Sequence, residues 1–246
     1  MIDPYIAEFI GTFFLLLLGT GVVANVTLKN TIAEGQSPWV LITSAWGFAV
    51  FVGVFISGQF SGAHLNPAVT LGLAVAGKFS WTLVPGYVIA QIIGAMFGAW
   101  ACYLTYIDHY RLTKDEGIVR STFFTGPAIR NFKNNFFSEF IGTFVLVFGV
   151  LFIAVPNIKI EGMVVENFGL GALQALPVAI LVWVIGMALG GTTGYAINPA
   201  RDFGPRLMYQ MLPRKNKDAD WPYAWIPILA PLAGGALAGF AYTYCV

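Results

Sequence analysis

Six long apolar runs, separated by short polar or glycine-rich segments, dominate the chain. They cover residues 5–26, 39–56, 81–106, 135–155, 170–190 and 223–244. A helix needs about 20 apolar residues to cross a hydrocarbon core of about 30 Å, and runs of this length and number exceed what a soluble core contains. The pattern therefore predicts an all-α membrane protein with six transmembrane helices in a lipid bilayer.

Two shorter segments carry the same tripeptide, Asn66-Pro67-Ala68 and Asn198-Pro199-Ala200. Asparagine is a favoured N-cap and proline is pre-set for the first helical turn, so each copy predicts a glycine-rich extended segment that turns abruptly into a helix. The apolar run after the first copy ends at residue 76, and the second is interrupted at Arg201 and Asp202, so neither helix spans the bilayer. Non-helical backbone at membrane depth is tolerated only in a protein interior or beside a water-filled cavity. The two segments therefore predict re-entrant half-helices beside an aqueous path.

The chain contains an internal repeat. The segment AEFIGTFFLLLLG from Ala7 returns as SEFIGTFVLVFG from Ser138, and the spacing between these two segments is nearly the same as that from Asn66 to Asn198. Each repeat holds three spans and one half-helix. Because three is odd, the second repeat enters the membrane from the opposite side, which inverts it about an axis in the membrane plane. We expect one transmembrane channel domain over residues 1–246, made of inverted repeats at about 1–120 and 121–246.

The paired Asn-Pro-Ala motifs, the doubled EFIGT segments and the Arg-Asp-Phe-Gly-Pro sequence after the second motif resemble the aquaporin superfamily. The resemblance covers nearly the whole chain, from about residue 7 to residue 235. It implies the aquaporin fold, in which six tilted helices and two half-helices surround one pore per subunit. It also implies a homotetramer in the cell membrane, with both termini in the cytoplasm.

The centre of such a pore has a chemistry that follows from helix dipoles. Two facing helix N-termini each carry roughly half a positive charge, and the side-chain amides of Asn66 and Asn198 donate hydrogen bonds to a permeating oxygen atom. Protons and cations meet an electrostatic barrier there. The alternative is that these asparagines are helix caps only. Backbone carbonyls along the glycine-rich segments are expected to line one wall, at Gly62, Ala63, His64, Gly190, Thr192, Thr193 and Gly194.

The resemblance places the selectivity filter at four positions, which are Trp46, Gly186, Tyr195 and Arg201. Water-selective members are similar to one another in carrying a histidine where this chain has Gly186. Glycine leaves room for carbon, Trp46 and Tyr195 form an apolar corner, and the Arg201 fork donates to two adjacent hydroxyls. This ring favours a passive channel for glycerol and other small uncharged solutes, with water, that excludes ions and protons. Lactic acid or urea as the main solute is the alternative.

Four further positions resemble the glycerol-conducting branch of the family, namely Asp202, Arg206, Pro227 and Ile228. The first two are four residues apart on a helix and are also compatible with a plain ion pair. Tyr195 stands where several bacterial glycerol facilitators have phenylalanine, so we expect its hydroxyl to add a polar atom to the opening and to narrow it slightly.

Two acidic residues lie within apolar runs, and one histidine lies beside the first Asn-Pro-Ala motif. Glu8 and Glu139 are related by the repeat, and each is expected to brace a re-entrant loop by accepting backbone N–H groups that would otherwise be unsatisfied. The alternative role is that of a proton carrier. His64 borders the first motif, where it is expected to be a strut of the loop, with a gate as the alternative.

Composition limits the other classes of function. Charged residues make up 10% of the chain and the net charge is +1, which argues against nucleic-acid binding. The chain lacks a nucleophile–base set, a metal-ligand cluster and a phosphate loop, so we expect no enzyme, cofactor or metal. A secondary transporter is the main competitor, because inverted repeats and broken helices also serve alternating access. With cytoplasmic termini, only Lys78 and Lys159 lie on the inner side, against the positive-inside tendency.

Overall fold

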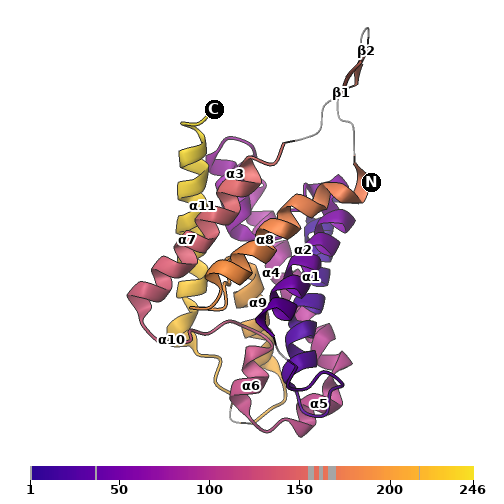
Figure 1. Ribbon diagram of the computed structural model, residues 1–246, viewed down its shortest axis with the longest axis vertical. Helices are drawn as coiled ribbons and strands as arrows, with labels where there is room; N and C mark the ends of the chain where they lie inside the picture. Colours follow the sequence, from indigo (N-terminus) through magenta and orange to yellow (C-terminus); the bar gives the residue numbers. More distant parts are fainter. Residues whose placement is uncertain (1, 37, 155–157, 161–162, 166–169, 216) are drawn as a thin grey trace.

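The computed structural model describes residues 2–36, 38–154, 158–160, 163–165, 170–215 and 217–246 (Figure 1). Six helical segments in it are long and apolar enough to cross a membrane, which confirms the number of spans predicted from the apolar runs. The segments are α1 (Pro4–Thr27), α2 (Trp39–Ser61), α4 (Val84–Thr105), α7 (Phe132–Leu151), η1 (Gly171–Ala175) with α8 (Leu176–Leu189), and α10 (Trp221–Ala224) with α11 (Ile226–Tyr242). In the last two segments a short helical turn, η1 or α10, leads into the main helix.

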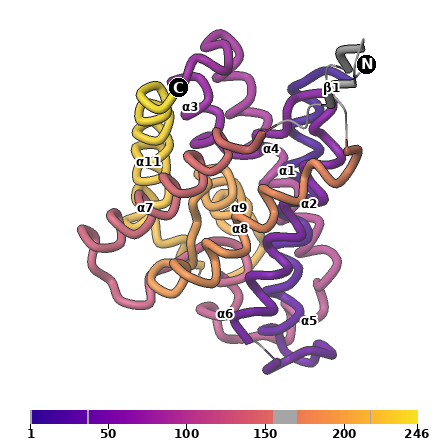
Figure 2. Tube along the Cα trace, turned by 45° about the horizontal axis from the view of Figure 1, so that its top comes forward, coloured from indigo at the N-terminus to yellow at the C-terminus, as the bar shows by residue number. Residues whose placement is uncertain are grey.

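Both predicted half-helices are present, as α3 (Pro67–Val75) and α9 (Pro199–Met211). At 9 and 13 residues, they measure about 14 Å and about 20 Å along their axes, so neither crosses a bilayer. The second one continues through Arg201, Asp202 and Pro205, although the apolar pattern is interrupted there. In the tube view α9 lies in the middle of the molecule, surrounded by the spans (Figure 2), and it packs mainly against α4.

The two repeats pack in the same way. α1 packs extensively along α4, and α7 packs in the same manner along α11. Phe9 and Phe140 occupy equivalent positions of the two EFIGT segments, and a Cβ on Gly94 or on Gly234 would overlap the carbonyl of one of them. Small residues therefore let each helix pair approach to backbone contact, which is how membrane helices associate.

Some elements lie outside the predicted pattern. The polar linker between the repeats forms two short helices, α5 (Ile107–Leu112) and α6 (Glu116–Ser121). Between α7 and α8, strand β1 (Ile158–Ile160) pairs antiparallel with β2 (Met163–Val165), and the pair projects away from the helical body (Figure 1). Strands of this length are too short to give a period-two signal. The fourth span ends at Leu151, whereas its expected end at residue 155 lies outside the described residues.

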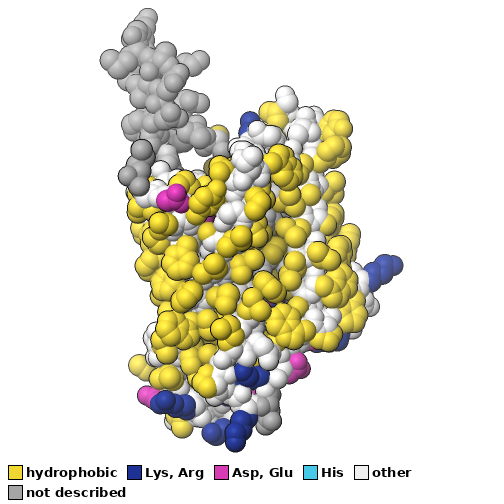
Figure 3. Space-filling view, turned by 180° about the vertical axis from the view of Figure 1, so that it is seen from behind, with side chains coloured by type: hydrophobic (Ala, Val, Ile, Leu, Met, Phe, Trp, Pro, Cys, Tyr) yellow, Lys and Arg dark blue, Asp and Glu magenta, His cyan; other side chains and the backbone are white. Residues whose placement is uncertain are grey.

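The outer surface is divided by side-chain type. Hydrophobic side chains cover the middle of the molecule, and most Lys and Arg side chains in this view gather at its lower end (Figure 3). Both chain termini lie near the opposite end (Figure 1). An apolar belt around six apolar helices is the surface that a lipid bilayer requires, so the chain is a multi-pass membrane protein.

Candidate functional site

The two half-helices meet N-terminus to N-terminus through their capping asparagines. The Oδ1 atom of Asn66 accepts from the backbone N of Ala68 at 2.8 Å, and the same atom of Asn198 accepts from Ala200 at 3.0 Å. Each Nδ2 donates across to the other loop, from Asn66 to the carbonyl of Ile197 at 2.8 Å. The reciprocal bond from Asn198 to the carbonyl of Leu65 is also 2.8 Å long. Each amide therefore caps its own helix, binds the facing loop and keeps a second N–H hydrogen, since an amide carries two.

The loops that lead into these caps are strained in the same way in both repeats. Ala63 and Leu65 have φ values of 51° and 52°, and their counterparts in the second repeat, Tyr195 and Ile197, have 39° and 41°. Residues other than glycine rarely adopt this left-handed conformation, which costs on the order of 1–3 kcal/mol each. The surrounding structure must hold such loops in place.

Two buried carboxylates hold the loops. Glu8 accepts from the backbone N of His64 at 2.9 Å and of Leu65 at 2.8 Å, and also from the side chains of Ser61 and Gln91, both at 2.7 Å. Glu139 makes the matching backbone contacts in the second repeat, with Ala196 at 2.9 Å and Ile197 at 2.8 Å. Hydrogen bonds to a charged group are among the stronger ones in proteins. These contacts are the ones that the loop-bracing hypothesis requires.

A single cavity of about 270 Å³ contains both asparagines in its lining. Its wall follows α2 from Trp46 past Val50 to Val54, a length of about 12 Å. Tyr195 and Arg201 share the end at Trp46, while Gln174, from η1, also lines the cavity. The helical framework therefore surrounds an elongated space in which the half-helix N-termini lie between two differently lined ends.

One end of the cavity carries a cation against aromatic rings. The guanidinium carbon of Arg201 lies 4.0 Å from the ring centroid of Trp46, and its Nη1 donates to the carbonyl of Phe123 at 3.4 Å. Trp46, Tyr195 and Arg201 all line the cavity, so the structure brings three of the four predicted filter residues to one place. The guanidinium keeps further N–H donors for a solute, because it carries five.

The fourth filter position, Gly186, lies behind Tyr195. A Cβ at Gly186 would lie 2.6 Å from Cζ of Tyr195 and 2.8 Å from its hydroxyl oxygen, closer than two such atoms can approach. The absence of a side chain at Gly186 therefore makes room for the Tyr195 ring. It makes room for a solute only indirectly, because it lets that ring stay out of the cavity.

The Tyr195 hydroxyl does not lie in the opening, where the sequence predicts it. It is buried, and it has no hydrogen-bond partner among the described residues. Because it points toward α8 at Gly186, the hydroxyl does not add a polar atom to the opening, and the face that Tyr195 offers to the cavity is apolar.

The predicted Asp202–Arg206 pair forms a buried ion pair at 2.8 Å, with both side chains fully enclosed. Asp202 also accepts from the backbone N of Thr125 at 2.9 Å and from its hydroxyl at 2.7 Å, and Arg206 donates to the carbonyl of Ala219 at 2.6 Å. The pair thereby ties the loop around residues 123–125, whose Phe123 carbonyl accepts from Arg201, to α9. Pro227 and Ile228 lie in the first turn of α11, where a proline costs no helical hydrogen bond.

Part of the predicted carbonyl wall lies elsewhere along the chain. Gly62, Ala63 and His64 line the cavity, and in the second repeat the lining residues are Tyr195, Ala196 and Ile197. The carbonyls of Gly190 and Thr192 accept backbone bonds from Gly194 at 2.9 Å and from Ala128 at 3.0 Å, while Thr193 and Gly194 precede the lining segment. The spacing from Asn66 to Asn198, applied to the lining residues Ala63, His64 and Leu65, is the signal that locates the second segment.

His64 is packed rather than free. Its ring lies 4.5 Å from that of Phe79 and 5.0 Å from that of Tyr87, measured between centroids. Its Nδ1 is 3.1 Å from the hydroxyl of Thr70. These contacts suit a strut that supports the loop before Asn66.

The internal repeat relates the filter to a second ring of positions on the cavity wall. The same spacing as that from Asn66 to Asn198 relates Trp46, Gly186, Tyr195 and Arg201 to a second set of positions, which are Val178, Val54, Ala63 and Val69. All four of these counterparts line the cavity. The repeat therefore supplies two rings of equivalent position, and only one of them carries a cation and large aromatic side chains.

Six membrane-crossing helices around two facing half-helices, with a solute-sized cavity between them, define a polytopic membrane protein with an internal passage. The model of the major intrinsic protein family matches residues 1–242. The chain belongs to this family.

Individual relatives agree over almost the whole chain. The probable glycerol uptake facilitator protein of Thermotoga maritima is 48% identical over 241 residues, which cover 98% of each protein. Glycerol uptake facilitator protein 3 of Lactiplantibacillus plantarum is 51% identical over 238 residues, covering 96% of this chain and 94% of the relative. The X-ray structure of the aquaglyceroporin from Plasmodium falciparum superimposes with a TM-score of 0.81 at 33% identity, covering 97% and 94% of the two chains. This chain is thus a membrane transport protein and not an enzyme.

Proposed function

We propose that the protein is a passive channel for glycerol and other small uncharged solutes, that it also conducts water, and that it excludes ions and protons. The observation that carries this proposal is the Arg201 guanidinium against the ring of Trp46, in a cavity that Tyr195 also lines. The relatives from Thermotoga maritima and Lactiplantibacillus plantarum are named glycerol uptake facilitators, which supports the same solute.

The ring suits a molecule with two unlike sides. A polyol has hydroxyls that accept hydrogen bonds from the Arg201 fork, and C–H groups that pack against Trp46 and Tyr195. At the centre, the second amide hydrogens of Asn66 and Asn198 are placed to donate to the next hydroxyl. A solute that lost its hydration without these partners would pay about 1–3 kcal/mol for each unpaired hydroxyl.

Exclusion of cations is assigned to the same two places. The half-helix N-termini each contribute roughly half a positive charge at the centre, and Arg201 adds a full charge at the ring. We propose Glu8 and Glu139 as braces of the loops, because each accepts two backbone N–H groups there. A carboxyl group held by two backbone N–H groups has its accepting oxygens occupied by the loop, which favours bracing over proton carriage.

We place the protein in the plasma or inner membrane as a homotetramer with cytoplasmic termini, as the family resemblance implies. Most of the basic side chains then lie outside. Several of these arginines are already neutralised by acidic partners, in the pairs Arg130–Asp220, Arg206–Asp202 and Arg214–Glu116. The positive-inside tendency counts Lys and Arg whether or not an acidic residue lies beside them, so these pairs leave the bias against this orientation in place.

A panel of solutes in proteoliposomes tests the proposed function. Stopped-flow light scattering should show fast re-swelling with glycerol, slower re-swelling with five-carbon polyols, and no response above that of protein-free vesicles with sodium chloride. Urea and lactic acid at low pH are included because they are the alternative solutes. Faster entry of either of these than of glycerol would overturn the assignment to polyols.

A further inference from the structure

We propose that Trp39 is a positioning residue that sets the width of the selective ring by holding the side chain of Tyr195 against α8. Trp39 is the first residue of α2, ahead of Trp46 on the same helix, and does not line the cavity. The inference rests on the proposed function, since it concerns the size limit of the same ring.

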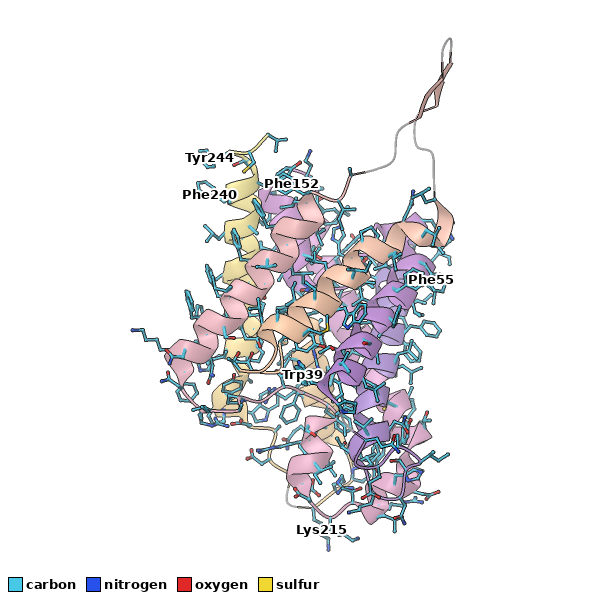
Figure 4. All side chains as sticks on the ribbon, in the orientation of Figure 1. Trp39, Phe55, Phe152, Lys215, Phe240 and Tyr244 are labelled. Carbon is cyan, nitrogen blue, oxygen red and sulfur yellow. The ribbon has the colours of Figure 1, made fainter. Side chains whose placement is uncertain are left out.

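Trp39 contacts two of the four filter positions, Gly186 and Tyr195. Its indole Nε1 donates to the carbonyl of Gly186 at 2.9 Å, and its ring meets that of Tyr195 edge to face, with centroids 5.9 Å apart and planes at 78°. In the stick view Trp39 lies well inside the outline of the molecule, near the lower end of α8 (Figure 4). One side chain thus joins the start of α2, the end of α8 and the tyrosine of the second loop.

The space around Tyr195 shows why this contact matters. A Cβ on Gly190 would lie 2.6 Å from Cδ1 of Tyr195 and 2.7 Å from Cζ2 of Trp39. The Tyr195 ring is therefore enclosed by Gly186 and Gly190, at the end of α8, and by the indole of Trp39. Dense packing of this kind transmits a change in one side chain to the next.

Within the described residues, packing and not hydrogen bonding holds the Tyr195 side chain in place. Its hydroxyl is buried without a partner within the described part of the chain, and its backbone has a φ of 39°. A buried unpaired hydroxyl is unfavourable, so the observed position depends on packing. Trp39 is 40% exposed, and its removal would open a space next to Tyr195 through which water could reach that hydroxyl. The aromatic ring of Tyr195 would then move away from the cavity, and the opening of the selectivity filter would widen.

The competing role for Trp39 is that of a membrane-interface anchor, which exposed tryptophans commonly have. Trp100 on α4 offers a matched control, because it is 42% exposed and its ring contact is Phe97, at 6.0 Å. An anchor role predicts similar effects of the two substitutions. A positioning role predicts an effect of Trp39 alone, and on selectivity.

The experiment compares Trp39→Ala, Trp39→Phe and Trp100→Ala in proteoliposomes, with the ratio of ribitol to glycerol permeability as the readout. This ratio does not depend on how many folded channels each vesicle contains. We expect Trp39→Ala to raise it at least about threefold, Trp39→Phe to lie between Trp39→Ala and wild type because it keeps the ring contact, and Trp100→Ala to match wild type. An unchanged or lower ratio in Trp39→Ala would overturn the proposal.

A double substitution tests whether Trp39 acts through Tyr195. In a Tyr195→Ala background, Trp39→Ala should leave the ribitol-to-glycerol ratio unchanged, because residues that act through one another are not additive. A further rise would refute the positioning role. If wild-type protein conducts no polyol at all, the proposed function fails; if it conducts glycerol and only the Trp39 effect is missing, this inference fails alone.

Discussion

Replacing Gly186 with histidine is expected to lower glycerol permeability at least about tenfold, equivalent to about 1.4 kcal/mol in the barrier, and to lower water permeability much less. A Cβ at this position would already lie 2.6 Å from the Tyr195 ring. The imidazole must therefore push Tyr195 into the cavity, where the tyrosine ring takes the space that a carbon chain needs. Water is smaller and keeps a path beside Arg201.

Gly191→His is the matched control for this prediction. Gly191 lies next to the same helix end, and a Cβ there would meet nothing within 4 Å, so permeability to both solutes should stay close to wild type. The comparison uses stopped-flow scattering with glycerol and with an impermeant osmolyte. An equal fall in glycerol and water permeability of Gly186→His would show that Gly186 does not act on selectivity.

Replacing Arg201 with valine is expected to abolish discrimination among polyol stereoisomers while water flux is kept. Arg201 is held by Trp46 at 4.0 Å and by the Phe123 carbonyl, which fixes the direction of its remaining donors. Without these N–H donors, polyols of either configuration meet the same free-energy barrier, so the ratio of ribitol to arabitol flux should approach about one. A small cation or proton leak should accompany this change, because one of the two positive barriers is gone.

Arg201→Lys separates charge from geometry. An ammonium keeps the positive charge but lacks the planar fork, so it should suppress the leak and fail to restore stereoselectivity. Retained selectivity between ribitol and arabitol in the valine variant would place selection elsewhere along the cavity.

The framework was predictable because its causes are local or periodic. The lengths of the apolar runs predict the spans, and the capping chemistry of Asn66 and Asn198 predicts where the half-helices begin. The nearly equal spacing of the two duplicated motifs predicts that the two repeats pack alike. These features depend on hydropathy and backbone propensity, which the sequence carries directly.

The packing around the selectivity filter was not predictable in the same way. The packing of Tyr195 over Gly186 and the contact of Trp39 with both depend on three segments that are brought together only by folding. Nothing in the apolar pattern distinguishes Trp39 from an interface anchor. Likewise, the ties from Asp202 to Thr125 join positions far apart in the sequence, and only the folded chain makes them neighbours.

Dependence of glycerol flux on concentration and on ion gradients in proteoliposomes tests the central claim most directly. Two half-helices fixed to each other through Asn66 and Asn198 describe a standing pathway, so initial glycerol flux should rise linearly with the glycerol gradient. It should also be unaffected by a proton or sodium gradient. Flux that saturates with glycerol concentration and is accelerated by either ion gradient would contradict a channel and would indicate alternating access.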